Sequence, residues 1–173
     1  MRAAYRDTPF HQRRGFPNAS PTAAGPLTAP PPIRLIRHSP LALRLRWHLA
    51  ALQALLNGHS FWASGRTGTD LHRMLGGSQA VVSAWQGHDL VGFGRATTDG
   101  VFRAVLWDVV VAEPLQGQGL GRRIVTDLIE HPKVAAAERV YLMTTNSAGF
   151  YQRLGFEEDH GQRLLLKCRP EPT

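Results

Sequence analysis

Hydrophobic and polar positions along the chain follow two different periods, and these periods predict a series of strands and helices. Apolar residues that alternate with polar ones, or run on for about four to eight positions, are typical of strands, and apolar residues three and four apart are typical of helices. The pattern predicts strands at 33–38, 80–85, 90–97, 102–111, 138–145 and 163–168, and helices at 41–56, 66–77, 120–129 and 147–154. The order β-α-α-β-β-β-α-β-α-β predicts an α/β (α+β) fold with a mixed sheet and helices packed on it.

Turn and cap residues separate these elements. Asn57-Gly58 is expected to stop the first helix, and Thr69 or Asp70 is expected to cap the second one at its start. The segment 86–89 and the dipeptide Asp99-Gly100 are typical of β-hairpin turns. The three strands between residues 80 and 111 are therefore expected to form two consecutive hairpins.

The first 32 residues differ from the rest in composition. They hold seven of the chain's twelve prolines among scattered Ala, Thr, Gly and Arg, with almost no hydrophobic periodicity. Such a segment buries too little apolar surface to offset the entropy of ordering it. We therefore expect a disordered extension at 1–32 and one folded domain at 33–173. The extension is rich in arginine and poor in acids, so it also has some features of an organelle transit peptide.

The charge is distributed as unevenly as the prolines. The 173 residues carry a formal net charge of +7, and residues 1–46 account for all of it, because residues 47–173 hold equal numbers of basic and acidic side chains. A nucleic-acid interface is normally a basic surface of the folded domain, so we expect no nucleic-acid partner. No apolar run approaches the roughly 18 residues of a membrane span. The lone Cys168 is interpreted as a small hydrophobic residue of the last strand.

Glycines occupy alternate positions in the segment "QGQGLG", residues 116–121, between a predicted strand and a predicted helix. The first backbone N–H groups of a helix have no partner within it and can bind an anion. The third glycine comes one position too early for the dinucleotide signature, and Arg122 and Arg123 stand where a P-loop needs Lys and Ser or Thr. The segment is therefore either the site of another anionic ligand or a tight turn without a ligand.

Together with a second segment, this turn resembles the signatures of the GNAT N-acetyltransferase superfamily. "QGQGLG" has the form Gln/Arg-x-x-Gly-x-Gly/Ala of the family's acetyl-CoA pyrophosphate signature, and "NSAGFYQRLGF", residues 146–156, is similar to its second signature. The run 61–166 resembles the cyanobacterial and plastid branch, which includes serotonin N-acetyltransferases and plastid lysine or N-terminal acetyltransferases. The resemblance implies the GNAT fold, in which strands 4 and 5 splay apart and bind acetyl-CoA. It does not cover residues 1–32.

The resemblance implies an acetyl-CoA site built mostly from backbone groups. It places the pantetheine arm along the strand that contains "VVV" and the pyrophosphate at the glycine-rich turn. The cofactor-binding residues expected from it are Val109, Val110, Val111, Gln116, Gly117, Gln118, Gly119, Leu120, Gly121, Arg122, Asn146 and Tyr151. For Asn146 the alternative is an N-cap of the helix that follows, and for the valines a buried side chain is compatible with the backbone role.

Two side chains are candidates for acid–base catalysis. The resemblance gives Tyr151 the role of the acid that protonates the CoA thiolate, and packing beside Phe150 and Phe156 is the alternative. Asp108 interrupts the apolar strand "LWDVVV". A carboxylate there is either the base that deprotonates the acceptor amine or a hydrogen-bonded structural group. The sequence leaves both roles of Asp108 open.

We therefore expect an enzyme that moves an acetyl group from acetyl-CoA, its co-substrate, to a primary amine by direct attack on the thioester, with no metal. The acceptor is a small-molecule arylalkylamine such as serotonin, or a lysine or N-terminal amine of a protein. A non-catalytic acyl-CoA-binding regulatory module on the same fold is the alternative. No membrane partner is expected, and a homodimer is left open. A single cysteine favours a reducing compartment, which predicts the cytoplasm, or the plastid stroma if the source is a plant or alga.

Overall fold

The computed structural model describes residues 29–38 and 48–168. The chain divides into two units, residues 1–30 and 31–173, and the fold below is that of the second unit. Residues 1–28 of the predicted disordered extension, and residues 41–47 of the first predicted helix, lie outside the described residues.

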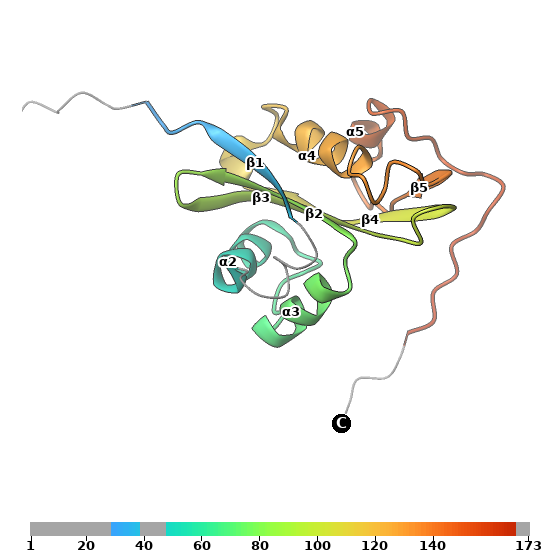
Figure 1. Cartoon of the computed structure of the whole chain (residues 1–173), viewed down its shortest axis with the longest axis horizontal. Coiled ribbons are helices and arrows are strands. Elements are labelled where there is room, and N and C mark those ends of the chain that lie inside the picture. Colours follow the sequence, from blue (N-terminus) through green and yellow to red (C-terminus); the bar gives the residue numbers. More distant parts are fainter. Residues whose placement is uncertain (1–28, 39–47, 169–173) are drawn as a thin grey trace, which may run out of the picture. The chain divides into compact units, whose positions relative to one another are not determined.

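Five strands form one mixed sheet in the order β1-β2-β3-β4-β5 (Figure 1). Their bounds are β1 Ile33–His38, β2 Ala80–Gln86, β3 Asp89–Thr98, β4 Arg103–Val111 and β5 Arg139–Tyr141. The first four strands pair antiparallel with their neighbours, whereas β5 pairs parallel with β4. The two predicted hairpins are confirmed, and each turn contains a glycine with positive φ, Gly87 in one and Gly100 in the other.

Helices cover both faces of this sheet. Helix α2, Leu49–His59, and helix α3, Gly68–Gly76, lie on one face, whereas α4, Leu120–Ile129, and α5, Ala148–Gln152, lie on the other (Figure 1). A short 3-10 turn at Glu113–Leu115 leads from β4 toward α4. The expected mixed, mostly antiparallel sheet flanked by helices is confirmed.

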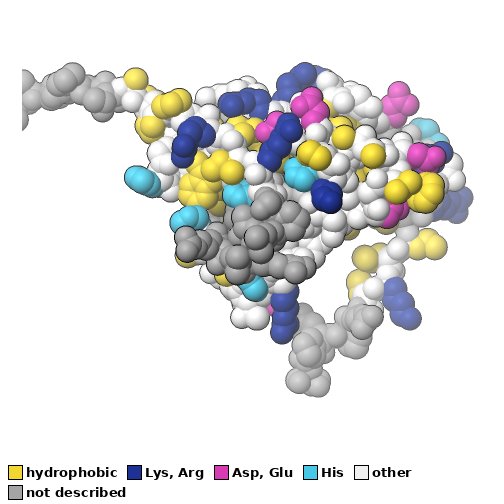
Figure 2. Space-filling model, viewed as in Figure 1, with side chains coloured by type: hydrophobic (Ala, Val, Ile, Leu, Met, Phe, Trp, Pro, Cys, Tyr) yellow, Lys and Arg dark blue, Asp and Glu magenta, His cyan; other side chains and the backbone are white. Residues whose placement is uncertain are grey.

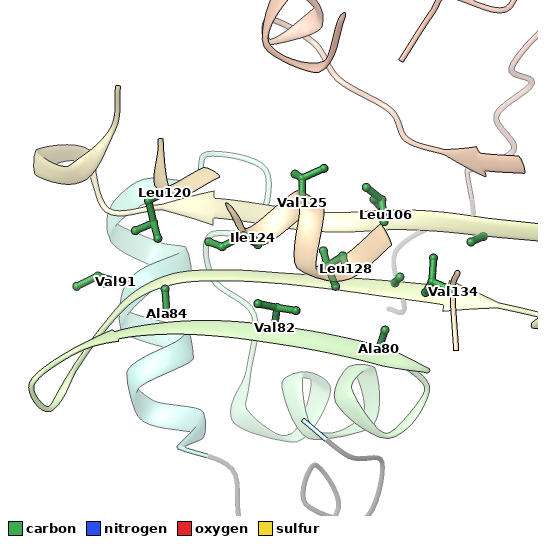
Figure 3. Close-up of a cluster of buried hydrophobic side chains, with 12 residues drawn as sticks. Ala80, Val82, Ala84, Val91, Leu106, Leu120, Ile124, Val125, Leu128 and Val134 are labelled. Carbon is green, nitrogen blue, oxygen red and sulfur yellow. The ribbon is translucent and has the colours of Figure 1, made fainter. Parts of the chain in front are cut away.

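Each face of the sheet has its own hydrophobic core. Figure 3 shows the core under α4, which contains the buried side chains of Ala80, Val82, Ala84, Val91, Leu106, Leu120, Ile124, Val125, Leu128 and Val134. The core under α2 and α3 contains Leu52, Leu55, Leu56, Leu71, Leu75, Val81 and Phe93. Neighbouring residues of β2 alternate between the two cores, because successive side chains of a strand point to opposite faces.

Two glycines of β3 let α4 approach the sheet closely. A Cβ atom on Gly92 would lie 2.7 Å from Cδ1 of Ile124, and one on Gly94 would lie 2.9 Å from side-chain carbons of Ile124 and Leu128. These distances are shorter than van der Waals contact, so a larger residue would push the helix away from the sheet. The position of α4, and of the turn that precedes it, depends on these two glycines.

Two predicted helix boundaries are wrong by a few residues. Helix α2 runs through Asn57-Gly58 and ends at His59. Helix α3 is capped by Thr67, whose Oγ1 accepts a hydrogen bond from the N–H of Asp70, so that Thr69 and Asp70 lie inside the helix. Burial of the apolar face of α2 outweighs the low helix propensity of its last residues. At α3, the extended backbone of Thr67 provides the geometry that an N-cap needs.

The strands predicted near the C-terminal end are shorter than expected or absent. Strand β5 covers only part of the predicted 138–145, and the predicted strand at 163–168 does not form among the described residues. An apolar run becomes a strand only where a partner edge lies beside it. The leucines at 164–166 are exposed instead, and so is Cys168, which is therefore not a buried strand residue.

The described surface carries mixed charge. On the face seen in Figure 2, Lys and Arg side chains lie among acidic and hydrophobic ones and form no continuous basic patch. Arg37, for example, pairs with Asp127 at 2.8 Å and with Glu130 at 3.3 Å. This agrees with the balanced charge of residues 47–173. Within the two described ranges, no helix has the length and apolar character needed to cross a membrane.

Candidate functional site

The glycine-rich segment 116–121 forms the turn into α4. Gly117 and Gly119 have φ angles of +74° and +82°, in the left-handed region that favours glycine, and Gly119 is the N-cap of the helix. The side chains of Gln116 and Gln118 fold back, and their Nε2 atoms donate to backbone carbonyl oxygens at 3.0 and 2.9 Å. These two bonds hold the turn in one shape.

Six consecutive backbone N–H groups at this turn have no hydrogen-bond acceptor. Among the described residues, no hydrogen bond is donated by the N–H groups of Gly117 through Arg122, and the first helical bond runs from Arg123 to Gly119 at 3.1 Å. The side chain of Leu120 is buried in the core under α4 and fixes the start of the helix. Unpaired N–H groups at the positive end of a helix dipole can bind a polyanion such as a pyrophosphate.

The third glycine of the segment serves packing inside the protein. A Cβ atom on Gly121 would lie 3.3 Å from Cζ of Phe150, in α5. The next residue, Arg122, is exposed, and its Nη2 donates to the carbonyl oxygen of Arg153 at 3.5 Å. Gly121 therefore brings α5 against the start of α4, and Arg122 adds positive charge at the same end of the helix.

Strand β4 contains a bulge at Asp108. In the pairing with β3, Trp107 lies opposite Arg95 and Val110 lies opposite Phe93, so that two residues of β4 face a single residue of β3. Asp108 has a φ of +51°, a conformation that residues other than glycine rarely adopt. The bulge therefore interrupts the regular alternation of side chains along β4.

The bulge determines which way the three valines of β4 face. Leu106 and Val109 are three positions apart and yet pack in the same core under α4, because the extra residue shifts the alternation. Val111 also packs there, whereas Val110 is buried in the core under α2 and α3. The valine side chains are thus structural. The backbone role that the resemblance implies for them stays a prediction.

The carboxylate of Asp108 is buried between two guanidinium groups. Its Oδ2 accepts a hydrogen bond from Nε of Arg95 at 2.6 Å, its Oδ1 accepts one from Nη1 of Arg66 at 3.0 Å, and the side chain is 6% exposed. These contacts agree with the structural alternative for this residue. The role of Asp108 as a base stays a prediction that no contact supports.

Strand β5 pairs along its whole length with the beginning of β4, and a cavity lies beyond the end of this pairing. The parallel pairing joins Arg103–Val105 to Arg139–Tyr141, while β4 continues to Val111. A cavity of about 710 Å³ is lined by residues of both strands, of α5 and of the segment 156–164. This arrangement agrees with the predicted splay of strands 4 and 5.

Tyr151 lies in the wall of this cavity. Its ring makes edge-on contacts with Phe150 and Phe156, with ring centroids 4.9 and 5.8 Å apart. Burial raises the pKa of the phenol above its ordinary value, so the hydroxyl keeps its proton at neutral pH. Tyr151 thus combines the packing predicted as the alternative with a position in which an acid could act.

Asn146 precedes α5 but does not cap it. The N-cap position is Ser147, and no side chain bonds to the first turn of the helix there. The side chain of Asn146 instead accepts a hydrogen bond from Oγ of Ser147 at 3.2 Å, and both residues lie outside the cavity lining. The N-cap alternative for Asn146 is therefore wrong, and a contact with the cofactor stays a prediction.

Sequence reasoning missed several residues of this region. Glu157, Glu158 and Asp159 line the same cavity as Tyr151, and so does Trp107. The acidic run directly after the second signature is a signal that could have drawn attention to the first three. In the described part of the chain, no group of His, Cys, Asp and Glu side chains is arranged to hold a metal ion.

Comparison with known families shows which family the chain belongs to. The sequence model of the acetyltransferase (GNAT) family matches residues 49–156. The chain belongs to this family. The matched stretch contains the glycine turn, the bulge of β4 and the segment with Tyr151.

Individual GNAT relatives match shorter stretches. The "uncharacterized N-acetyltransferase ycf52" of Pyropia yezoensis is 38% identical over 87 residues, which are 47% of this chain and 50% of that protein. A chloroplastic serotonin N-acetyltransferase 2 of Oryza sativa subsp. japonica is 43% identical over 70 residues, 40% of this chain and 35% of that protein. The chain thus spans half or less of the length of these curated relatives.

A solved structure shows the same fold. A GNAT-family protein from Xanthomonas campestris pv. campestris matches with a TM-score of 0.65 over 79% of this chain and 94% of that one, at 22% identity. At this level of identity the likeness shows the architecture, namely the mixed sheet with helices on both faces.

Proposed function

We propose that this GNAT-family chain is an acetyl-CoA-dependent N-acetyltransferase that transfers the acetyl group to a primary amine. The observation that carries the proposal is the row of free N–H groups at Gly117–Arg122, which the contact between Gly121 and Phe150 places next to the helix that carries Tyr151. An anion-binding turn can hold the pyrophosphate of CoA, and a protonated phenol can give its proton to the departing thiolate.

The free N–H groups and Arg122 would hold the pyrophosphate of CoA at the start of α4. The pantetheine arm would follow β4. Beyond Val105 no described strand pairs with this edge of β4. Backbone groups there are therefore available to the amides of the arm, except the carbonyl of Val111, which accepts from Gln116. The thioester would then lie near the cavity that contains Tyr151.

The chemistry follows from the bonds that change. An acceptor that arrives as an ammonium ion first releases one proton to water, because only the free amine has a lone pair with which to attack. The amine nitrogen attacks the thioester carbonyl carbon, the carbonyl oxygen becomes an oxyanion, and a backbone N–H of β4 is the donor we propose for it. The C–S bond then breaks, the sulfur takes a proton from the hydroxyl of Tyr151, and the nitrogen loses a proton that returns to the Tyr151 phenolate through water. The raised pKa of this phenol supports the assignment, because an acid must hold its proton until the sulfur leaves.

The lining of the cavity supports the proposal of an acceptor amine that has an apolar part and a cationic amino group. Trp107, Tyr141 and Phe156 contribute aromatic walls, while Glu157 and Glu158 bring negative charge to the lining. A protonated primary amine is attracted by such a lining. One relative is named a serotonin N-acetyltransferase, and an arylalkylamine fits these walls. A lysine or N-terminal amine of a protein presents the same reacting group.

For location, we propose the plastid stroma if the source is a plant or alga, and otherwise the cytoplasm. The chloroplastic name of the Oryza relative supports the first.

The test is a panel of amines incubated with the purified protein and acetyl-CoA. The panel holds serotonin, tryptamine, a lysine peptide with a blocked N-terminus and a peptide with a free N-terminus. We expect thiol release that depends on at least one amine, and a product heavier by one acetyl group. Binding of acetyl-CoA without turnover of any amine would instead favour the non-catalytic acyl-CoA-binding module. If the protein neither binds acetyl-CoA nor turns over any amine, both the acetyltransferase and the non-catalytic binding module are refuted.

A further inference from the structure

Three charged side chains meet behind the bulge of β4. Asp108 is 6% exposed, Arg95 is 14% exposed and Arg66 is 31% exposed, and each oxygen of the carboxylate accepts from a different guanidinium. Arg95 belongs to the neighbouring strand β3, and Arg66 belongs to the segment just before α3. The cluster therefore ties together two strands and a connection on the face opposite α4.

The cluster coincides with the strained point of the strand. A positive φ on a residue other than glycine is unfavourable and persists only where surrounding contacts fix it. Asp108 has this conformation, and its carboxylate makes two ion pairs at the same point of the strand. A bulge also redirects the residues that follow it, so the backbone of Val109 and Val110 is aimed by the conformation of Asp108.

Both arginines are themselves held in place. The carbonyl oxygen of Arg66 accepts from Nε2 of Gln53 at 2.8 Å. The guanidinium of Arg95 lies over the ring of Trp107, 5.6 Å from its centroid, and Nε1 of Trp107 donates to Oγ1 of Thr97 at 2.8 Å. Trp107 also lines the cavity with Tyr151, so the cluster connects the bulge to the cavity wall.

We propose that Asp108, Arg66 and Arg95 are positioning residues of the acetyl-transfer site, and that Asp108 is not its base. The clamp formed by their two ion pairs holds the bulge, and the bulge turns the backbone of Val109 toward the thioester, while Val110 pairs with Phe93 of β3. This inference rests on the proposed function. A base needs a free oxygen within hydrogen-bond reach of the proton it takes. Both oxygens of Asp108 are engaged, and the residue is not part of the cavity lining.

A clamp role and a general-base role for Asp108 predict different kinetics for the variants Asp108→Asn and Arg95→Met. A small misplacement of reacting groups costs about 100-fold in rate, so the clamp predicts that each variant loses about that much in kcat, and that the double variant loses no more than either single one. The pH profile keeps its shape, and Arg95→Lys recovers part of the loss. Arg37→Met, which removes the ion pairs of β1 with Asp127 and Glu130, is the matched control and leaves kcat unchanged.

A glycine variant separates the backbone conformation from the carboxylate. Asp108→Gly combined with Arg95→Met removes the carboxylate and one of its two guanidinium partners, leaves the partly exposed Arg66, and permits positive φ at residue 108. The clamp predicts a kcat above that of Arg95→Met alone, whereas a base predicts a kcat as low as that of Asp108→Asn. Recovery of Asp108→Asn at higher pH, with Arg95→Met fully active, would overturn the inference in favour of a base.

The amide NMR resonances of the protein give a readout that does not need turnover. In Arg95→Met we expect shifts at Val109 and Val110 and little change at Gly117–Arg122. Unchanged resonances at Val109 and Val110 would overturn the clamp whether or not the protein acetylates amines. Failure of the wild-type protein in the amine panel, with these shifts present, would refute the proposed function and leave the clamp standing.

Discussion

A Cβ atom on Gly121 would stand 3.3 Å from Cζ of Phe150. Gly121 lies in the first turn of α4, and Phe150 lies in α5 next to Tyr151. The glycines of "QGQGLG" therefore have two purposes. Gly117 and Gly119 shape the turn through their positive φ angles, whereas Gly121 sets how closely the helix with Tyr151 approaches the turn.

Gly121→Ala tests this packing role. The new methyl group would press on Phe150, whereas Gly149→Ala, also in a helix, gains the same helix propensity and would meet only a flexible Arg153 atom at 3.8 Å. We expect the free energy of unfolding of Gly121→Ala to be about 1 kcal/mol below that of Gly149→Ala, at the low end for overpacking. Phe150→Leu should cost less stability in Gly121→Ala than in the wild type, because the ring is what the methyl meets. Thermal unfolding of the wild type and these variants measures the differences, and a Gly121→Ala as stable as Gly149→Ala would refute the packing role.

Tyr151→Phe tests the proposed acid. The variant keeps the ring contacts with Phe150 and Phe156 and loses only the hydroxyl. We expect kcat to fall by about 100- to 10,000-fold, the usual contribution of a general acid, with little change in the affinity for coenzyme A. Steady-state kinetics and calorimetry measure the two quantities. A kcat close to that of the wild type would make Tyr151 a packing residue and leave protonation of the sulfur to water.

The protonated state of Tyr151 also predicts how kcat depends on pH above neutrality. Its pKa is raised above the ordinary value of about 10 by burial. Wild-type kcat should therefore show no loss from this group between pH 7 and about 10. A loss near pH 8 that disappears in Tyr151→Phe would contradict the assignment.

The position of His38 predicts that the free energy of unfolding falls in acid. Its Nε2 lies 2.7 Å from Oγ of Ser83 between β1 and β2, and burial lowers its pKa to about 4. The unfolded chain, with a pKa of about 6.5, then binds more protons than the folded one, so the free energy of unfolding falls as the pH drops from about 6.5 to about 4. Chemical denaturation at pH 7 and pH 5 should show a smaller difference for His38→Gln than for the wild type. The exposed His88 provides the control substitution, and an equal difference in His38→Gln would contradict the prediction.

The sequence predicts helices and strands correctly where hydrophobic residues recur with a clear period. Strands β2, β3 and β4 and helix α4 were predictable, because each carries one or two apolar faces that the sheet and its helices cover. The leucines at 164–166 show the limit of this reasoning. Their apolar run predicts a strand, but no neighbouring edge pairs with it among the described residues.

The residues of the candidate site also differ in how far the sequence predicts them. The glycine turn and Tyr151 stand in contiguous segments, so the sequence alone indicated both. The ion pairs of Asp108 join it to Arg95 and Arg66, which are 13 and 42 positions away. An acid inside an apolar strand signals a special role, but only the fold shows which partners reach it.

The most direct test of the anion-binding turn compares two glycines with the same backbone conformation. Gly119 and Gly100 both have a φ of +82°, and at both positions an added Cβ would meet no atom within 4 Å. Alanine therefore strains both by a similar amount, roughly 1–2 kcal/mol. Gly100 lies in the hairpin between β3 and β4, whereas Gly119 lies within the row of free N–H groups.

The measurement is the calorimetric affinity of Gly119→Ala and Gly100→Ala for coenzyme A, with thermal unfolding of each. A shifted turn loses at least one hydrogen bond to a charged oxygen, which is worth about 1.5–3 kcal/mol, so we expect Gly119→Ala to bind at least about tenfold more weakly. Gly100→Ala should bind as the wild type does, with a similar loss of stability. Equal, wild-type affinity in both folded variants would show that the turn does not hold the pyrophosphate.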